Sequence, residues 1–174
     1  MSKLITPVFR GSFVHLNEPH AMKGVEGAKP KYSITVVIPK ADPFWAKVDK
    51  LVNETAMAKW GKIPPKLKTP VRDGDEEGRP ETAGMSTFNA SSMNRPGVVD
   101  ANLQPIIDPE EIYSGAYYRA SIRAFAWEVP TGKGVSIALD NVQKVKDGEK
   151  FSGRTDAASD FADFGAAAED DLLA

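Results

Sequence analysis

Hydrophobic and polar residues alternate along several stretches of the chain, which is the pattern of half-buried β-strands. The stretch from Leu4 to Leu16 predicts a long first strand that bends near Gly11. The cleanest alternation runs from Lys31 to Ile38. One face of this second strand is expected to be apolar and the other more polar: Tyr32, Ile34, Val36 and Ile38 against Lys31, Ser33, Thr35 and Val37.

A helical period replaces the alternation after this strand. Asp42 is a suitable N-cap, Pro43 suits the first helical position, and Gly61 suits the C-terminal end. Apolar residues recur at helical spacing in between, so the helix is expected to lay one stripe against a sheet. The stripe consists of Phe44, Val48, Leu51, Val52 and Thr55. Trp45 and Trp60, near the two ends, are expected to pack rather than to bind a ligand.

The second half of the chain again predicts strands. Three are short, and two long ones are joined by a glycine-rich turn at 130–134, which is a strong hairpin signal. The expected strands are Thr87–Ser91, Gly97–Val99, Leu103–Ile107, Gly115–Val129 and Gly134–Val145. Segments 15–30 and 62–84 are expected to be long loops. The plan is mostly β with one helix, and a small closed or partly closed barrel fits it best, because closure removes exposed strand edges.

The strand from Gly115 to Val129 has two faces of different chemistry. The even positions from Tyr118 to Ala126 are mostly small and apolar, as the inside of a tight barrel requires. The odd positions interleave aromatic rings with arginines on the expected outer face. These positions are Tyr117, Arg119, Ser121, Arg123, Phe125 and Trp127.

Aromatic rings interleaved with arginines are the groups that a single strand of DNA needs. Unpaired bases stack on rings, and arginine supplies positive charge for phosphates, so the odd face predicts a sequence-tolerant site for single-stranded DNA. The alternative is that the helix or a long loop covers these rings. Other candidate contacts lie outside this strand: Lys31, Lys66, Lys68, Phe88, Arg95 and Lys144. Phe88 is equally compatible with the core.

Charge is distributed unevenly along the chain. The net charge is −2, yet all 22 lysines and arginines lie at or before Arg154, and the six charged residues that follow are all acidic. We therefore divide the chain into a domain at 1–150 and a disordered acidic tail at 151–174. The tail is expected either to compete with DNA for the basic groove or only to keep the protein soluble. Its candidate regulatory residues are Asp160, Phe161, Asp163, Phe164, Glu169, Asp170 and Asp171.

No motif for catalysis or for a cofactor is identifiable. Gly132-Lys133-Gly134 lacks the upstream glycine and the hydroxyl residue of a phosphate-binding loop. The chain has no cysteine, and its two histidines have no adjacent acid, so no zinc site is expected. The acidic run between Asp73 and Glu77 is interpreted as a solvated loop rather than a cation site. No membrane span is predicted.

Several segments resemble phage-encoded single-stranded DNA-binding proteins. The similarity runs in order along nearly the whole chain: 31–40, 89–92, 95–100, 115–125, 141–145, 148–149 and 153–154. It implies an OB-fold barrel, coating of single-stranded DNA in phage replication or recombination, and a regulatory acidic tail that contacts replication proteins. The implied location is the cytoplasm of an infected bacterium.

Two features depart from that family pattern. An OB barrel usually places its helix after three strands, whereas only two clear strands precede Asp42. The chain also ends in acids followed by Leu172-Leu173-Ala174, without a terminal phenylalanine. Two other function classes remain open at this point: a nuclease acting on branched DNA, which needs clustered carboxylates, and a protein–protein adaptor that uses the aromatic strand.

Overall fold

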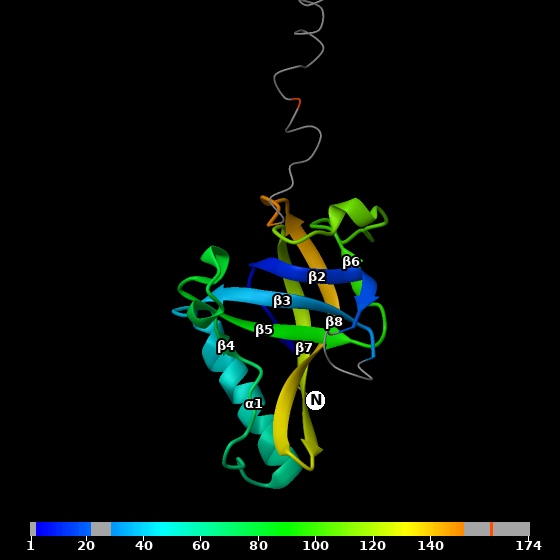
Figure 1. Cartoon of the computed structure of the whole chain (residues 1–174). Coiled ribbons are helices and arrows are strands. Elements are labelled where there is room, and N and C mark those ends of the chain that lie inside the picture. Colours follow the sequence, from blue (N-terminus) through cyan, green and yellow to red (C-terminus); the bar gives the residue numbers. More distant parts are fainter. Residues whose placement is uncertain (1–2, 22–28, 152–160, 162–174) are drawn as a thin grey trace, which may run out of the picture.

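The computed structural model describes residues 3–21, 29–151 and 161. It contains eight strands, one α-helix and three short 3-10 helices, and Figure 1 shows their arrangement. The strands are β1 (Leu4–Ile5), β2 (Phe9–His20), β3 (Lys31–Pro39), β4 (Arg72–Asp73), β5 (Met85–Ser92), β6 (Gly97–Val99), β7 (Tyr117–Val129) and β8 (Gly132–Lys146). The α-helix is α1 (Phe44–Trp60), and the 3-10 helices are η1 (Gly74–Glu77), η2 (Pro80–Thr82) and η3 (Pro109–Glu111).

Five strands pair in a closed ring. Its order is β7–β2–β3–β5–β8, and β8 pairs back onto β7. All neighbours in the ring are antiparallel except β5 and β8, which are parallel. The short strands extend it: β1 pairs with β7, β6 with β8, and β4 with β5. The ring confirms the predicted mostly-β plan, although it is less regular than an ideal barrel.

The core fills the ring and confirms the alternation of β7. The side chains of Tyr118, Ala120, Ile122 and Ala124 are buried, whereas their odd-numbered neighbours are not. The Tyr118 hydroxyl donates to the carbonyl of Tyr113 at 2.7 Å and accepts from its N–H at 2.9 Å. Burial raises the pKa of this phenol strongly. The ring of Tyr118 lies against Gly11, where a Cβ would come within 2.6 Å of it, so only glycine fits at this position of β2.

Helix α1 begins at Phe44 and lies against β7 and β8 below the ring (Figure 1). The Asp42 carboxylate accepts a hydrogen bond from the Phe44 N–H at 2.8 Å, and Pro43 occupies the capping position. The helix ends as predicted at Gly61, whose φ of 70° closes the last turn. Its buried stripe is Phe44, Val48, Leu51, Val52 and Ala56. Among the described residues, two ring strands, β2 and β3, precede the helix, and α1 lies between β3 and β5 in chain order.

The predicted first strand and the loop after it were partly wrong. The strand is interrupted between Ile5 and Phe9, so the predicted first strand is two strands, β1 and β2. The second of these continues to His20 through residues assigned to a loop, because it pairs irregularly with β3. Register shifts at two places let polar and proline-containing sequence remain in the ladder.

Two other expectations were also wrong. Segment 103–107 is not a strand, because the Asp100 carboxylate accepts from the backbone N–H groups of Asn102 and Gln104 and folds the chain into a turn. Segment 62–84 contains β4, η1 and η2. Lys40 holds this segment against β3 by ion pairs of 2.6 Å to both Asp73 and Asp75.

Candidate nucleic-acid interface

Side chains on the outer face of the ring form a continuous band across all five ring strands. The register places His15 opposite Ser33, Ser33 opposite Ser91, Ser91 opposite Ala138, and Ala138 opposite Arg123. In a neighbouring row, Thr35 lies opposite Asn89 and Ser136 lies opposite Phe125, and Thr35, Asn89 and Ser136 line one hollow. We call these two rows, together with Phe13 and Lys31, the outer band. Its middle is small and polar, so an extended ligand can approach the backbone there.

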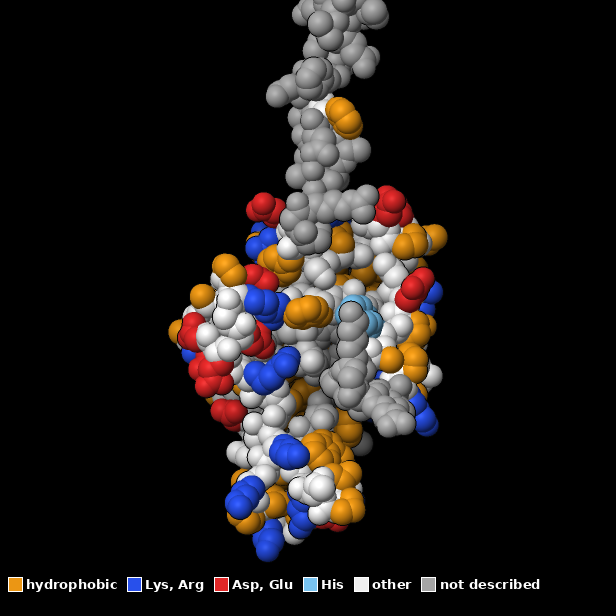
Figure 2. All heavy atoms as spheres, in the orientation of Figure 1, with side chains coloured by type: hydrophobic (Ala, Val, Ile, Leu, Met, Phe, Trp, Pro, Cys, Tyr) orange, Lys and Arg blue, Asp and Glu red, His pale blue; other side chains and the backbone are white. Residues whose placement is uncertain are grey.

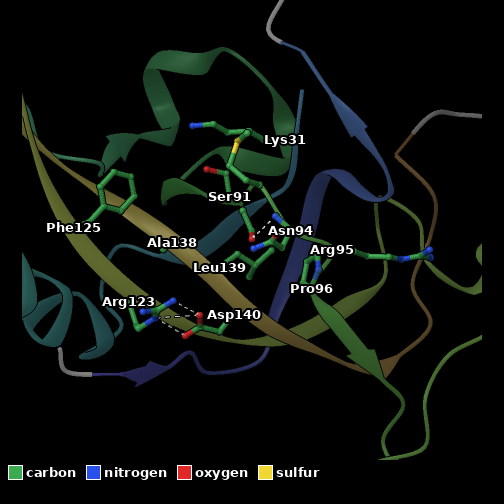
Figure 3. A pocket seen from close by; sticks show the side chains of 12 residues that line it. Lys31, Ser91, Asn94, Arg95, Pro96, Arg123, Phe125, Ala138, Leu139 and Asp140 are labelled. Carbon is green, nitrogen blue, oxygen red and sulfur yellow. Dashed lines mark hydrogen bonds and ion pairs between the residues drawn. The ribbon is translucent and has the colours of Figure 1, made fainter. Parts of the chain in front are cut away.

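Two hollows follow the outer band and share Lys31 and Ser91. The larger, of about 940 Å³, lies over β2, β3 and β5, and extends to Arg72 and Arg79. The smaller, of about 370 Å³, lies between Lys31, Arg95 and Phe125 (Figure 3). Because they share two lining residues, the hollows form one path across the ring.

At the β2 end of the band, Phe13 is an exposed aromatic ring. Its backbone has a φ of 45°, in the left-handed region, and its side chain is 56% exposed. The guanidinium of Arg79 lies 4.6 Å from the ring centroid. Glu77 and Glu81 both pair with Arg79, at 2.5 and 3.4 Å. Phe13 therefore has one face held by a cation, in a geometry suited to stacking.

At the β7 end, Phe125 is 36% exposed and lines the smaller hollow. The Arg123 guanidinium donates to both carboxylate oxygens of Asp140 at 2.8–3.0 Å, as the dashed lines in Figure 3 show. The indole N–H of Trp127 donates to Ser136 Oγ at 2.9 Å. Arg123 is therefore already balanced by a carboxylate, whereas the Phe125 ring remains available.

The structure brings together some of the predicted contacts and separates others. Lys31, Arg95, Arg123 and Phe125 share the smaller hollow. Trp127 adjoins the band through Ser136, and the Lys68 ammonium lies 5.8 Å from its ring centroid. Lys66 is exposed on the same stretch of chain as Lys68.

The other predicted residues of β7 and β8 lie at the far end of these strands, next to β6. Arg119 donates to Gln143, and the Lys146 ammonium lies over the Tyr117 ring at 4.7 Å. Lys144 is largely covered and pairs with Asp147 at 2.6 Å. Tyr117, Arg119 and Lys144 are thus outside both hollows.

Phe88 is a core residue, which corrects its assignment as a candidate contact. Its side chain is fully buried, with its ring edge-on to Trp45 at 5.8 Å and tilted toward Phe44 at 6.5 Å. Strand alternation points its neighbour Asn89 outward, so Phe88 must point inward. No base reaches this ring while the core is intact.

The larger hollow also contains residues that had not been predicted as contacts, among them Phe13, His15, His20, Arg72 and Arg79. The sequence contained a signal for Phe13, because a phenylalanine close to a glycine bend in a strand can lie on either face of the sheet. Arg72 and Arg79 carried none, because their segment reaches the band only by folding back along β5.

Three acids of the run between Asp73 and Glu77 pair with the protein's own cations: Asp73, Asp75 and Glu77. Hydrogen bonds from Lys40 hold the pKa of Asp73 and Asp75 below its usual range. Burial alone would raise the pKa of Glu77, but hydrogen bonds from Arg79 and Thr87, with the nearby arginine charges, lower it. Within 3–21, 29–151 and 161, no three potential ligands gather to hold a metal ion.

Of the predicted tail residues, only Phe161 falls within the described part of the chain, and it is exposed. Asp160, Asp163, Phe164, Glu169, Asp170 and Asp171 lie outside the described residues. In the part of the chain that is described, no helix is long and apolar enough to cross a membrane.

This chain is similar to several proteins, among them the following three. The single-stranded DNA-binding protein from bacteriophage Enc34, solved in complex with ssDNA, superposes with a TM-score of 0.74 at 30% identity, over 86% of this chain and 89% of that one. Gp2.5, a single-stranded DNA-binding protein encoded by bacteriophage T7, gives a TM-score of 0.65 at 15% identity, over 90% and 98%, a likeness of fold. Putative protein p50 of Acyrthosiphon pisum secondary endosymbiont phage 1 is 32% identical over 95% of both chains.

The family comparison covers almost the full length. The model of the family described as "Enterobacter phage Enc34, ssDNA-binding protein" matches residues 2–173. This match confirms the resemblance to phage single-stranded DNA-binding proteins inferred from the sequence, and the matching fold confirms the OB-like assignment. The chain belongs to the Enc34 family of phage single-stranded DNA-binding proteins.

Proposed function

We propose that this chain binds single-stranded DNA along the outer band, without reading its sequence and without catalysis. The observation that carries the proposal is the band itself: exposed aromatic rings at two ends and a small polar middle with lysine and arginine beside it. The Enc34 relative at 30% identity was solved with ssDNA bound, which supports the same ligand for this chain.

The physical basis is stacking together with charge. Each base stacked on an aromatic ring contributes roughly 1–3 kcal/mol, and every base offers such a face. Lys31 and Arg95 are exposed, and in the described part of the chain neither has a carboxylate within 4.0 Å. Their positive charges can therefore attract phosphates. Duplex DNA hides its base faces, so the single strand is preferred.

A fluorescence titration with oligo-dT at several salt concentrations tests the proposal, because it reports stacking and charge together. We expect log affinity to fall linearly with log salt, with a slope of about −0.7 per phosphate neutralised. Mixed-sequence oligonucleotides are expected to bind within about tenfold of oligo-dT, because stacking and phosphate contacts do not depend on base identity. Sharp dependence on one sequence motif, or equal binding of duplex, would contradict the proposal.

A cleavage assay separates this function from a nuclease. Labelled branched and single-stranded DNA, incubated with the protein and Mg²⁺, is expected to remain intact. An adaptor function is separated by the titration itself, since an adaptor has no reason to bind oligo-dT in a salt-dependent manner.

We further propose that the protein coats DNA during phage replication or recombination in the cytoplasm of the infected bacterium, and that the acidic tail competes with DNA for the band. Removing residues 155–174 deletes six acids and no base. The truncated protein should therefore bind oligo-dT more tightly at low salt and depend more steeply on salt. Equal affinities at low salt would leave the tail only a solubilising role. Binding of replication proteins to the tail is tested separately by pull-down with the full chain.

A further inference from the structure

The two histidines of this chain stack on each other inside the larger hollow. The ring centroids of His15 and His20 are 4.3 Å apart and the ring planes are 8° from parallel. Both residues line the hollow with Lys29, Lys31 and Arg72. Figure 2 shows the pale-blue histidines on the same face as blue side chains of Lys and Arg.

An irregularity in β2 creates this contact. His15 pairs with Ser33 and His20 pairs with Lys31, so β2 advances by five residues while β3 advances by two. In a regular strand, residues five apart would lie on opposite faces and too far apart to touch. The extra residues of β2 return His20 to the face of His15. The stacked pair is thus made by the same strand irregularity that the alternation pattern did not predict.

The charges around the pair are mostly positive. Lys31 is the first residue of β3 and Lys29 lies just before it, whereas Arg72 and Arg79 come from the segment folded along β5. The strand β5 and the adjoining part of β8 contribute only uncharged residues to the hollow. On β2 itself the one acidic residue is Glu18, which is exposed.

Among the described residues that line the hollow, the single carboxylate is Glu77, and it is already paired. It pairs with Arg79 at 2.5 Å and accepts from Thr87 at 3.1 Å. Burial, with the neighbouring His20, lowers the pKa of His15. Without DNA, therefore, burial and the neighbouring His20 oppose a positive charge on the His15 imidazole, and Lys29, Lys31 and Arg72 line the same hollow.

Resting on the proposed function, we propose that the His15–His20 pair is a proton-linked phosphate contact: when the DNA backbone enters the hollow, the pair takes up a proton and binds the phosphate as an imidazolium. The one carboxylate among the described lining residues, Glu77, is already paired, so a phosphate adds a new negative charge, which favours a protonated imidazole. Binding and protonation then favour each other, by the same factor in each direction.

The linkage has a definite sign. DNA raises the pKa of the imidazole, so affinity rises as the pH falls through the value in the complex, and levels off below the value in the free protein. A rise of one pKa unit corresponds to about tenfold tighter binding at the low-pH limit. The additional charge also adds one phosphate contact, so the salt slope should be steeper at pH 6 than at pH 8 by about 0.7.

The test begins with the unmodified full-length protein. Only two histidines are present, so the imidazole NMR signals report on this pair alone. Titrating them between about pH 5.5 and 8 with and without oligo-dT, whose bases do not titrate in this range, should show a higher pKa in the complex. Unchanged imidazole pKa values would overturn the proposal, and this measurement requires no variant.

Binding measurements provide the second arm. The variant with both His15→Gln and His20→Gln should bind oligo-dT with little pH dependence and with the same salt slope at pH 6 and pH 8. Phe125→Ala is the matched control, expected to lose affinity equally at every pH. If the double variant keeps the pH profile of the parent, the histidines only pack. If the parent does not bind oligo-dT at any pH, the proposed function fails instead.

Discussion

The two ends of the outer band present aromatic rings in different ways. At the β2 end, Phe13 has a left-handed backbone, and its ring is covered on one side by Arg79 from the folded-back segment. At the β7 end, Phe125 occupies an ordinary strand position in the longest ladder of the ring, opposite Ser136. Both rings stand beside an arginine that is balanced by carboxylates, Arg79 by Glu77 and Glu81, and Arg123 by Asp140.

The difference shows what each end depends on. The β7 end is held by paired strands and should change little unless the closed ring of strands itself unfolds. The β2 end depends on residues 72–84, a segment anchored by Lys40 and by the short pairing of β4. We therefore expect the β7 end to be a fixed platform and the β2 end to respond to changes in the segment beside it.

The largest effect on oligo-dT affinity should come from removing the two exposed aromatic rings of the outer band. Phe13→Ala and Phe125→Ala should each weaken oligo-dT binding by about 1–3 kcal/mol, roughly 5- to 150-fold, at a nearly unchanged salt slope. The losses should add in the double variant, because the ends lie on opposite sides of the band. Fluorescence anisotropy at fixed salt measures this. A loss confined to one variant would mean that DNA occupies only one of the two hollows.

Charge changes should divide according to ion pairing. Lys31→Ala and Arg95→Ala should each flatten the salt slope by about 0.7, because each removes a free cation. Arg123→Ala should flatten it less, since Asp140 already balances that charge. Asp140→Asn should release Arg123 and give a steeper slope and a few-fold tighter binding. Equal slopes for Arg123→Ala and Lys31→Ala would show that DNA displaces Asp140 from its arginine.

A smaller effect on DNA binding is expected from changing the packing of Trp127 against the β7–β8 hairpin. A Cβ at Gly134 would collide with the Trp127 indole, whereas one at Gly132 would make only ordinary contacts, the nearest at 3.5 Å. Gly134→Ala should therefore shift tryptophan emission and weaken DNA binding a few-fold, and Gly132→Ala should do neither. Matching behaviour of the two variants would exclude a role for the indole position.

The smallest effect should follow Lys40→Gln, which loosens the segment at the β2 end. The Asp73 and Asp75 pKa values should rise toward their ordinary value, since Lys40 lowers both. In the parent these ion pairs stabilise the fold above the ordinary carboxyl pKa, near 4, and the stabilisation is lost as the pH falls through the lowered values. The Gly84 amide, which donates to Asp75, should exchange faster with solvent, while affinity changes by less than about twofold. An unchanged exchange rate would mean that β4 alone holds the segment.

The sequence predicted one end of the band and missed the other for a physical reason. In β7 the alternation is unbroken, so the position of Phe125 follows from its odd number. In β2, Phe9 and Phe13 have the same parity, yet Phe9 is 3% exposed and Phe13 is 56% exposed. The positive φ at Phe13 and the register shift after Ser12 turn the following side chains to the opposite face of β2. The residue types in this stretch do not predict that change of face.

Long-range packing explains the other differences. Whether Phe88 or Asn89 faces outward depends on which face of β5 packs against Trp45 of α1. The local sequence pattern of β5 does not contain that information. The pairing of Arg123 with Asp140 likewise joins two strands, and a register shift between Ser121 and Ile122 precedes it. The fold class, the helix and the hairpin were predictable because local periodicity and turn residues determine them.

The closure of the ring has a consequence for cooperativity. β2, β3 and β5 form one block and the β7–β8 hairpin forms another, and each junction between the blocks has only two paired positions, Phe9–Tyr118 with Arg10–Tyr117 and Ala90–Ile137 with Ser91–Ala138. Because the outer band crosses the second junction, a DNA strand lying on it touches both blocks at once. The ligand thus bridges one of the two sparsely paired junctions of the ring, and the protein with DNA bound should unfold more cooperatively than the free protein.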